Sequence, residues 1–483
     1  MKSLKLAACI ASTSLLIACG GSSSSSDSNA NANSSTPAIN MEKAQLVLNT
    51  NADIALAAYT DSVVTAKALK TALATFKAEP TEANLTAAKK AWLVAREPYG
   101  QTEVYRFRNS PIDSLDVEGD INAWPLGEAL IDYVNTGNDG DDFDNDQIGV
   151  TEHGLGDDIT SAINVTNADP ANTIIGNTDI VINKALLDKG LAAEDEHDVI
   201  SGYHAIEFLL WGQDLNTTDK STTNGADRNL AVNITEAGGQ RPLTDFTTDI
   251  HADRRHAYLE VVVDKLIADL ERVQTEWAKD STTNYRATFT TIADAADAKQ
   301  KLTEILTGMG TLSEGELAGE RMQIAFSANS QEDEHSCFSD NTHRDIWLNA
   351  EGVSNSFYGE YAGYDSNLDG TDNVTTNAVN GYGIEDYLTE VGLTSIATDT
   401  KAALDLTKTN YTAIDASARA RSPFDVLIMK ANRTADSDVA KTITSLSAQA
   451  RLLQTAANQL GLGNVVDKEA SSCDTQDPTS ECE

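Results

Sequence analysis

Residues 41–77 read MEKAQLVLNTNADIALAAYTDSVVTAKALKTALATFK and set the pattern that the rest of the chain follows. Apolar side chains recur there every three or four positions, at Leu46, Ile54, Leu56, Tyr59, Val63, Leu69, Leu73 and Phe76. Residues at that spacing lie on one face of an α-helix, so the stretch predicts a single long helix with one buried face. Pro80 ends the pattern.

The same helical spacing returns along most of the chain. Further helices are expected at 82–96, 184–193, 196–212, 249–279, 291–308, 312–327, 384–395, 398–413, 417–433 and 437–460. Pro98 and Gly100 predict a break or kink after the second helix. The strict alternation that is typical of strands is scarce. The sequence therefore predicts an all-α fold of two helical-bundle halves, 41–283 and 284–465, with a C-terminal tail, 466–483.

The composition excludes several classes of protein. The chain has 483 residues and carries 35 Lys and Arg against 74 Asp and Glu, a formal net charge of −39. Phosphate contacts need clustered Lys and Arg, so no nucleic-acid partner is expected. The acidity also argues against electrostatic docking on anionic lipid, and it attracts cations. Five cysteines in this length exclude a disulfide scaffold or a Cys-rich metal framework.

The N-terminus has the features of a targeting segment. Residues 1–18, MKSLKLAACIASTSLLIA, combine a short basic start with an apolar stretch, as signal peptides do. The sequence LIACG at 16–20 resembles a bacterial lipobox, which implies that Cys19 is lipidated. A plain signal peptide cut near Ala18 is the alternative. Residues 19–40 are rich in Ser, Asn, Ala and Gly and predict a flexible tether.

The lipid anchor is the only membrane contact that the sequence predicts. No other segment is long and apolar enough to cross a bilayer. The expected location is therefore the periplasm. Gly20, rather than Asp, follows the lipidated cysteine, which favours the outer membrane by analogy with lipoprotein sorting.

The segment GYHAIEFLLWG at 202–212 is the main candidate for chemistry. His204 and Glu207 stand three residues apart, so a helix would place both on one face. A neutral imidazole and a carboxylate suit iron, zinc or manganese. The alternative is a core histidine that is hydrogen-bonded to its neighbouring glutamate. His197, two turns earlier, is a candidate supporting residue, with a surface or capping histidine as the alternative.

This segment resembles the Gly-x-His-x-x-Glu motif of the imelysin family, also called the M75 peptidase family. The stretch REPYGQTEVYRF at 96–107 resembles the first block of that family, and Pro423-Phe424-Asp425 resembles a late one. The runs GERM at 319–322 and QEDEHSCFSDNTH at 331–343 resemble the iron-regulated protein A branch. The resemblance covers roughly residues 41–460.

The resemblance implies an all-α fold whose two halves enclose a site in the cleft between them. It also implies an exported protein that is linked to iron uptake or iron starvation. The peptidase label has little support in the residues, because the chain has neither His-Glu-x-x-His nor His-x-x-Glu-His. Zinc hydrolysis needs three protein ligands and a base, and His204 with Glu207 supplies two ligands at most.

Glu103 is the expected third ligand, because it follows the break at Pro98 and Gly100. Arg106, one turn later, and Asp113 are the expected supporting residues. A salt-bridge network between helices is the alternative for all three.

A second cluster of candidate residues lies in 332–343. Its members are Glu332, Asp333, Glu334, His335, Asp340 and His343. The cluster is expected to line the cleft, with a separate transition-metal site or a solvated acidic loop as alternatives. Cys337 inside it predicts partial burial. Cys473 and Cys482 of the tail could pair with each other, or one of them with Cys337, and the sequence leaves this choice open.

The leading hypothesis is a lipid-anchored periplasmic protein that binds a metal ion in metal acquisition. Divalent or ferric iron is the expected metal, with zinc as the alternative, and an iron-transport protein is the expected partner. His204, Glu207 and Glu103 would be the ligands. A metallopeptidase of the M75 type is the second hypothesis. The third is a non-catalytic scaffold that binds a partner protein or an organic anion through Arg106.

Overall fold

The computed structural model describes residues 36–134, 173–190, 199–214, 238–331, 333–467 and 472–482. The predicted signal peptide, Cys19, most of the tether, His197 and Glu332 lie outside these residues. Residues Pro37–Glu483 form one compact unit. Within the described part of the chain, no helix has both the length and the apolar character needed to cross a membrane.

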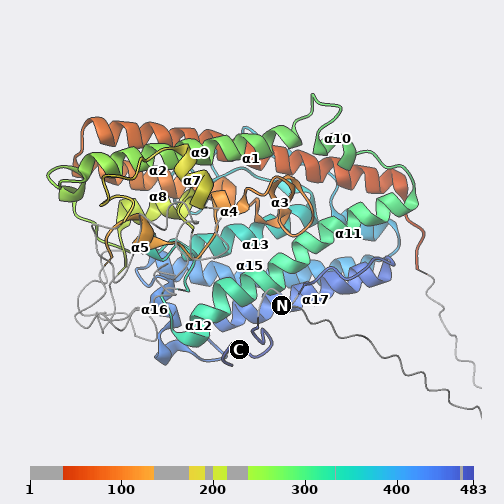
Figure 1. Ribbon diagram of the computed structural model, residues 1–483. Coiled ribbons are helices and arrows are strands. Elements are labelled where there is room, and N and C mark those ends of the chain that lie inside the picture. The colour runs from red at the N-terminus through yellow and green to blue at the C-terminus, as the bar shows by residue number, and fades with distance from the viewer. Residues whose placement is uncertain are drawn as a thin grey trace, which may run out of the picture. The chain divides into compact units, whose positions relative to one another are not determined.

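Helix α1 (Met41–Ala78) packs against two other long helices, α2 (Glu82–Gly100) and α9 (Ala252–Trp277) (Figure 1). The side chain of Asn40 caps α1 by accepting the Lys43 N–H at 3.2 Å. Helix α8 (Gly202–Trp211) packs against α2 and α9. The predicted helix over 41–77 is confirmed, and its expected inward residues Leu69, Leu73 and Phe76 are buried.

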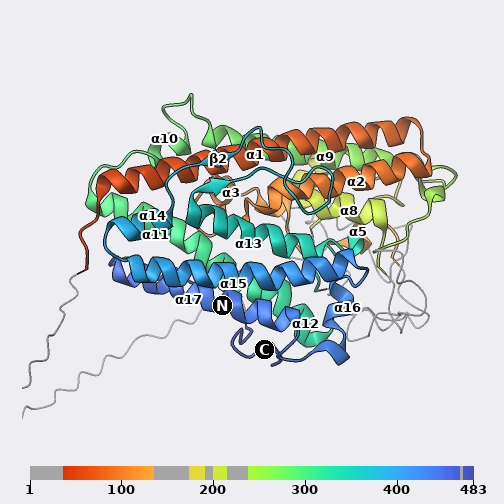
Figure 2. The same cartoon turned by 180° about the vertical axis from the view of Figure 1, so that it is seen from behind.

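A second group of helices comes from the later part of the chain. Helix α15 (Thr394–Arg419) lies along α17 (Asp438–Gln459), and α13 (Thr342–Tyr358) packs on α15 and α2 (Figure 2). Helix α11 (Ala295–Thr311) continues directly into η5 (Leu312–Ile324), which is a π-helix, and then into α12 (Ala325–Ala328). Wide π-helical turns are uncommon and often occur at functional sites.

Short elements connect these helices. They are η1 (Glu103–Tyr105), α3 (Pro111–Ser114), α4 (Glu118–Ile121), α5 (Glu128–Ile131), α7 (Lys184–Gly190), η4 (Leu243–Phe246), α10 (Tyr285–Phe289), η6 (Cys337–Ser339), α14 (Ile384–Glu390), α16 (Phe424–Ile428) and η7 (Lys430–Asn432). The strands β1 (Glu360–Tyr361) and β2 (Val379–Asn380) form an antiparallel pair, with Glu360 opposite Asn380. The predicted all-α fold is confirmed.

The hydrophobic core draws on both predicted halves. One cluster of buried side chains extends from Ala44 in α1 to Val465 after α17. A smaller cluster, which includes Leu317 and Ile443, lies among the later helices. The boundary near residue 283 stays a prediction.

One local boundary was wrong. The break expected between helices 398–413 and 417–433 lies after Arg419 instead, because the buried Tyr411 and Ile414 continue the apolar face of α15, and α16 follows at Phe424–Ile428. The break expected at Pro98 and Gly100 comes at Gly100, because α2 runs through Pro98 and ends at that glycine. A Cβ at Gly100 would lie only 2.7 Å from the Cβ of Leu348, so this glycine allows α13 to approach closely.

The tail folds back on η5 and contains a disulfide between Cys473 and Cys482. Thr475 donates a hydrogen bond to the Glu314 carboxylate at 2.9 Å, and the Gln323 side chain donates one to the Asp474 carbonyl at 3.1 Å. Cys337 is buried and lies outside this disulfide.

His343 belongs to an ion network between α13 and α15. Its Nδ1 lies 2.8 Å from Asp415 Oδ1, and the Arg419 Nε donates to Asp415 Oδ2 at 2.6 Å. Arg344 reaches the same carboxylate at 3.3 Å. Burial raises the pKa of Asp415, but these hydrogen bonds and charges outweigh that effect and leave the pKa well below its usual value.

We expect Asp415→Asn to lower the free energy of unfolding at pH 7 by about 3 kcal/mol, because the basic groups around it lose their counter-charge. The folded-state pKa is depressed, so this stabilisation is complete above the unfolded-state pKa, about 4, and is lost progressively as the pH falls from there toward the folded-state pKa. Denaturant unfolding of both proteins from pH 7 to pH 3 measures the difference. The exposed Asp399→Asn on the same helix is the control, and a difference that persists unchanged at pH 3 would contradict the prediction.

Candidate functional site

Helix α8 carries the Gly-x-His-x-x-Glu motif into the interior of the protein. The helix begins at Gly202 rather than at residue 196, because Gly202 has a φ of 81° that breaks the regular backbone. A Cβ at Gly202 would lie 2.4 Å from the Ile121 carbonyl oxygen, so only glycine fits there. His204 and Glu207 are both 0% exposed. The motif is therefore a buried polar pair inside an apolar helix.

His204 lies between a carboxyl group and a second imidazole. Its Nδ1 is 2.9 Å from Glu207 Oε2, and its Nε2 is 3.2 Å from His335 Nε2. On the far side of the second ring, His335 Nδ1 is 2.7 Å from Asp345 Oδ2. Four side chains from α8, the segment before η6 and α13 thus form one line of contacts.

The charges along this line follow from burial. Burial lowers the pKa of His204 well below its usual value and that of His335 to about 4, so both rings are neutral at pH 7. Burial raises the pKa of Glu207 to about 8. Burial would also raise the pKa of Asp345, but the Arg96 charge and the bond to His335 outweigh it, and Asp345 is ionised.

One direction of hydrogen bonding satisfies every group in this state. The protonated Glu207 donates to His204 Nδ1, His204 Nε2–H donates to His335 Nε2, and His335 Nδ1–H donates to Asp345. The other Glu207 oxygen, Oε1, accepts from the Ser339 backbone N–H at 3.0 Å and from its hydroxyl at 2.6 Å.

A buried arginine links this line to Glu103. Arg96 donates to Asp345 Oδ1 at 2.9 Å and also to the Asn122 side-chain oxygen. The Asn122 amide in turn donates to Glu103 Oε1 at 3.3 Å. Three side chains, Asn122, Arg96 and Asp345, thus separate Glu103 from the histidine pair.

Glu103 itself belongs to a network of arginines and acids. Its Oε2 accepts from Arg106 at 3.1 Å and from Arg321 at 3.0 Å. The π-helical η5 supplies both Arg321 and Glu316, which are 2.8 Å apart. Burial raises the pKa of Glu103, but the two arginines outweigh it and lower the pKa overall. The contacts of Glu103 therefore agree with the alternative prediction, a salt-bridge network between helices.

The three predicted ligands do not gather around one point. Among the described residues, the only group of three acidic, histidine or cysteine side chains within reach of one ion is Asp214, Asp340 and Asp425. His204 instead meets His335, from the second predicted cluster. Asp113 supports the backbone: its carboxylate accepts the N–H groups of Arg108 at 3.2 Å and of Ser110 at 3.1 Å.

A cavity of about 430 Å³ opens beside His335. Four acids line it against two arginines: Glu118, Glu316, Glu320 and Asp333, with Arg106 and Arg321. Trp124 also lines it and packs edge-on against the His204 ring at 4.9 Å. A larger cavity, of about 700 Å³, lies beside α13 and α15 and has no histidine in its lining, so the smaller one is the candidate site.

Three side chains that contact the histidine pair or its partners could not be predicted from the sequence. Asp345 and Trp124 belong to none of the motifs named above, and their spacing in the sequence does not predict a contact with the histidine pair. Arg96 stands at the start of the block at 96–107, but its role depends on contacts with Asn122 and Asp345 that are distant in sequence.

Comparisons with known proteins bear on the family and the fold. The family model described as Imelysin, Peptidase M75, matches residues 55–453. Iron-regulated protein A of Synechococcus elongatus is 38% identical over 73 residues, which are 15% of this chain and 20% of that protein. The match thus spans about a fifth of the length of this curated relative.

Two solved structures share the fold. An iron-regulated protein A precursor from Parabacteroides distasonis superimposes with a TM-score of 0.55 at 15% identity, covering 88% of this chain and 96% of that one. An imelysin-like protein from Psychrobacter arcticum gives a TM-score of 0.50 at 13% identity, covering 89% of this chain and 98% of that one. With a family model that matches most of its length, this chain belongs to the imelysin family.

Proposed function

We propose that this imelysin-family protein binds an iron ion, or another divalent metal ion, as cargo in metal acquisition, with His204 and His335 as its nitrogen ligands. The observation that carries the proposal is that the Nε2 atoms of two buried, neutral imidazoles face each other at 3.2 Å. Glu207 then supports His204 instead of binding the ion, and Glu103 belongs to the salt-bridge network.

The distance between the two rings fits one shared ion. Two nitrogens that each lie about 2.1 Å from a metal at a tetrahedral angle are about 3.4 Å apart, close to the 3.2 Å here, and binding releases the proton that His204 Nε2 shares with His335. Each ring also has a carboxyl group at Nδ1, Glu207 for His204 and Asp345 for His335. A carboxylate behind the imidazole fixes the ring and strengthens it as a ligand, which is the usual arrangement at metal sites.

The chemistry of the surroundings favours a cation that comes and goes. A closed structural site uses four protein ligands, whereas two imidazoles leave most of the coordination sphere to water or to the incoming ligand. The four acids against two arginines in the adjacent cavity attract cations. The names of the relatives, iron-regulated protein A, add an iron-related context.

The two alternative functions find less support. A zinc peptidase needs a third protein ligand and a free base, but Glu207 is buried and bonded to both His204 and Ser339. An anion-binding scaffold needs an available arginine, but Arg106 faces Glu103, Glu118 and Glu316 within 3.4 Å. These contacts disfavour an anionic ligand at Arg106.

The proposed location rests on the lipobox-like sequence at 16–20. The disulfide between Cys473 and Cys482 supports export, because disulfides persist in oxidising compartments. We propose the periplasmic face of the outer membrane, with an iron-transport protein as the partner that receives the ion.

We expect the double variant His204→Ala/His335→Ala to lose one bound metal ion per chain. The measurement is titration of the chelator-treated protein with Fe²⁺ under anaerobic conditions and with Zn²⁺, followed by elemental analysis. His251→Ala, the same substitution at a half-exposed position outside the site, is the control. Equal metal content in the folded double variant and the wild type would refute the ligand assignment.

Glu207→Gln should weaken metal binding by about 10–100-fold without removing either ligand, because a metal ion at Nε2 leaves the remaining His204 proton at Nδ1 beside an ionised Glu207, and an amide cannot supply that negative charge. A competition titration with a chromogenic chelator measures the affinity. Glu390→Gln on the exposed end of α14 is the matched control. Unchanged affinity would mean that Glu207 does not support a metal ligand.

Cys19→Ser should release the protein from the membrane fraction of the cells that produce it and abolish labelling with a radioactive fatty acid, because the acyl chain is the only proposed anchor. Cys9→Ser, in the same signal segment, should leave both readouts unchanged. Retention of label in Cys19→Ser would contradict the lipid anchor.

A further inference from the structure

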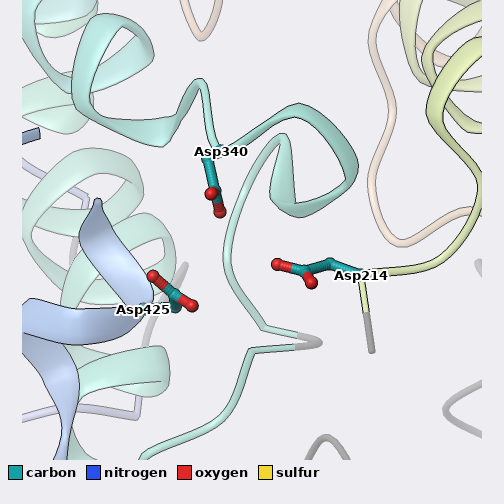
Figure 3. Close-up of side chains that lie close together, drawn as sticks. All are labelled: Asp214, Asp340 and Asp425. Atoms are coloured by element: carbon teal, nitrogen blue, oxygen red, sulfur yellow. The ribbon is translucent and has the colours of Figure 1, made fainter. Parts of the chain in front are cut away.

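Three buried aspartates from distant parts of the chain converge at a place outside the histidine pair. Asp214 follows α8, Asp340 stands between η6 and α13, and Asp425 lies in α16. Their carboxylates point toward a common space (Figure 3), and ligand atoms from the three lie within 4.8 Å of one another. The side chains are only 6%, 4% and 2% exposed.

A fourth acid and an amide add oxygen atoms to this place. Glu334 is 1% exposed, and its Oε2 is a buried oxygen without a hydrogen-bond partner. The charges of Asp425, Asp340 and Asp214 all act on its carboxyl group, so Glu334 lies close to the three aspartates. Gln331 has a buried Oε1 that also lacks a partner, while its Nε2 donates to Asp425 Oδ2 at 2.8 Å.

Backbone groups provide part of the stabilisation of these oxygens. The Gly238 N–H donates to Asp340 at 2.7 Å, and the Val426 N–H donates to Asp425 at 2.7 Å. The Thr342 hydroxyl donates to the other oxygen of Glu334, Oε1, at 2.9 Å. A buried group of carboxylates is strongly stabilised by a cation at its centre.

The ligand set points to a hard divalent cation. All five side chains offer oxygen atoms. Calcium and magnesium prefer oxygen ligands, whereas softer metals prefer nitrogen or sulfur. Calcium takes six to eight oxygens at about 2.3–2.6 Å, so ligands on opposite sides of it are about 5 Å apart, and three oxygens that lie within 4.8 Å of one another can all reach one such ion. Magnesium keeps several waters and uses fewer protein oxygens.

Another acidic loop of the described chain lacks this character. Asp365, in a loop between β1 and β2, accepts the N–H of Leu368 at 2.7 Å and that of Gly370 at 2.6 Å. Its two oxygens therefore stabilise the turn itself. Glu334 Oε2 and Gln331 Oε1 accept no such hydrogen bond.

We propose that Asp214, Asp340 and Asp425, together with Glu334 and Gln331, bind one calcium-class ion that joins the end of α8, the segment 331–341 and α16. The site is separate from the proposed iron site and does not depend on it. The segment 331–341 also carries His335 and Ser339, which contact His204 and Glu207. The ion would thus hold in place the segment that positions the histidine pair.

The test is a calcium titration of the full chain after chelator treatment. We expect calorimetry to give one Ca²⁺ per chain, and saturating Ca²⁺ to raise the melting temperature by about 2–5 °C. The double variant His204→Ala/His335→Ala should keep this response, which separates the calcium site from the iron site. A wild-type protein with neither binding heat nor a shift in melting temperature would overturn the proposal.

Variants locate the ion. Asp425→Asn and Glu334→Gln should each weaken calcium binding at least about 10-fold, because each removes one negative ligand. Asp399→Asn, the same change on an exposed helical face, should leave it unaltered. Glu334→Gln is the milder variant and provides the test if Asp425→Asn does not fold. A calcium response that survives in both variants would overturn the assignment.

Discussion

The contact between two neutral imidazoles in the interior is the constraint on which the rest of the site depends. His204 and His335 come from segments more than a hundred residues apart, and each ring needs a partner at both nitrogens because it is buried. Glu207 and Asp345 supply those partners at Nδ1. This requirement fixes α8 against α13, and through Arg96 it extends to α2.

Buried arginines balance the negative charge of the carboxylates that lie in the core around the histidine pair. Asp345 remains ionised in the core because Arg96 lies against it, and Glu103 remains ionised because Arg106 and Arg321 do the same. The π-helical turns of η5 contribute to this by presenting Glu316 and Arg321, five residues apart, to each other. An uncommon backbone conformation thus lies where acids and bases must be matched.

The sequence predicted the helices well and the site only in part. Apolar residues three and four apart are a local signal, and they predicted α1, α9 and α17 to within a few residues. His204 with Glu207 is local too, and the prediction that they lie together is confirmed. The pairing of His204 with His335 is not local, and Asp345 has no spacing that reveals it. Glu103 was expected beside His204 because it is acidic and near a proline, but two arginines hold its carboxylate elsewhere.

The segment 331–341 contributes side chains to both proposed ion sites, with His335 on one side and Glu334 and Asp340 on the other. If both proposed ions bind, the conformational entropy lost on ordering these residues would be common to the two binding events. The ion that arrives first would then leave a pre-organised segment for the second, which would be positive heterotropic cooperativity. By thermodynamic reciprocity, calcium would strengthen iron binding by the same factor by which iron strengthens calcium binding.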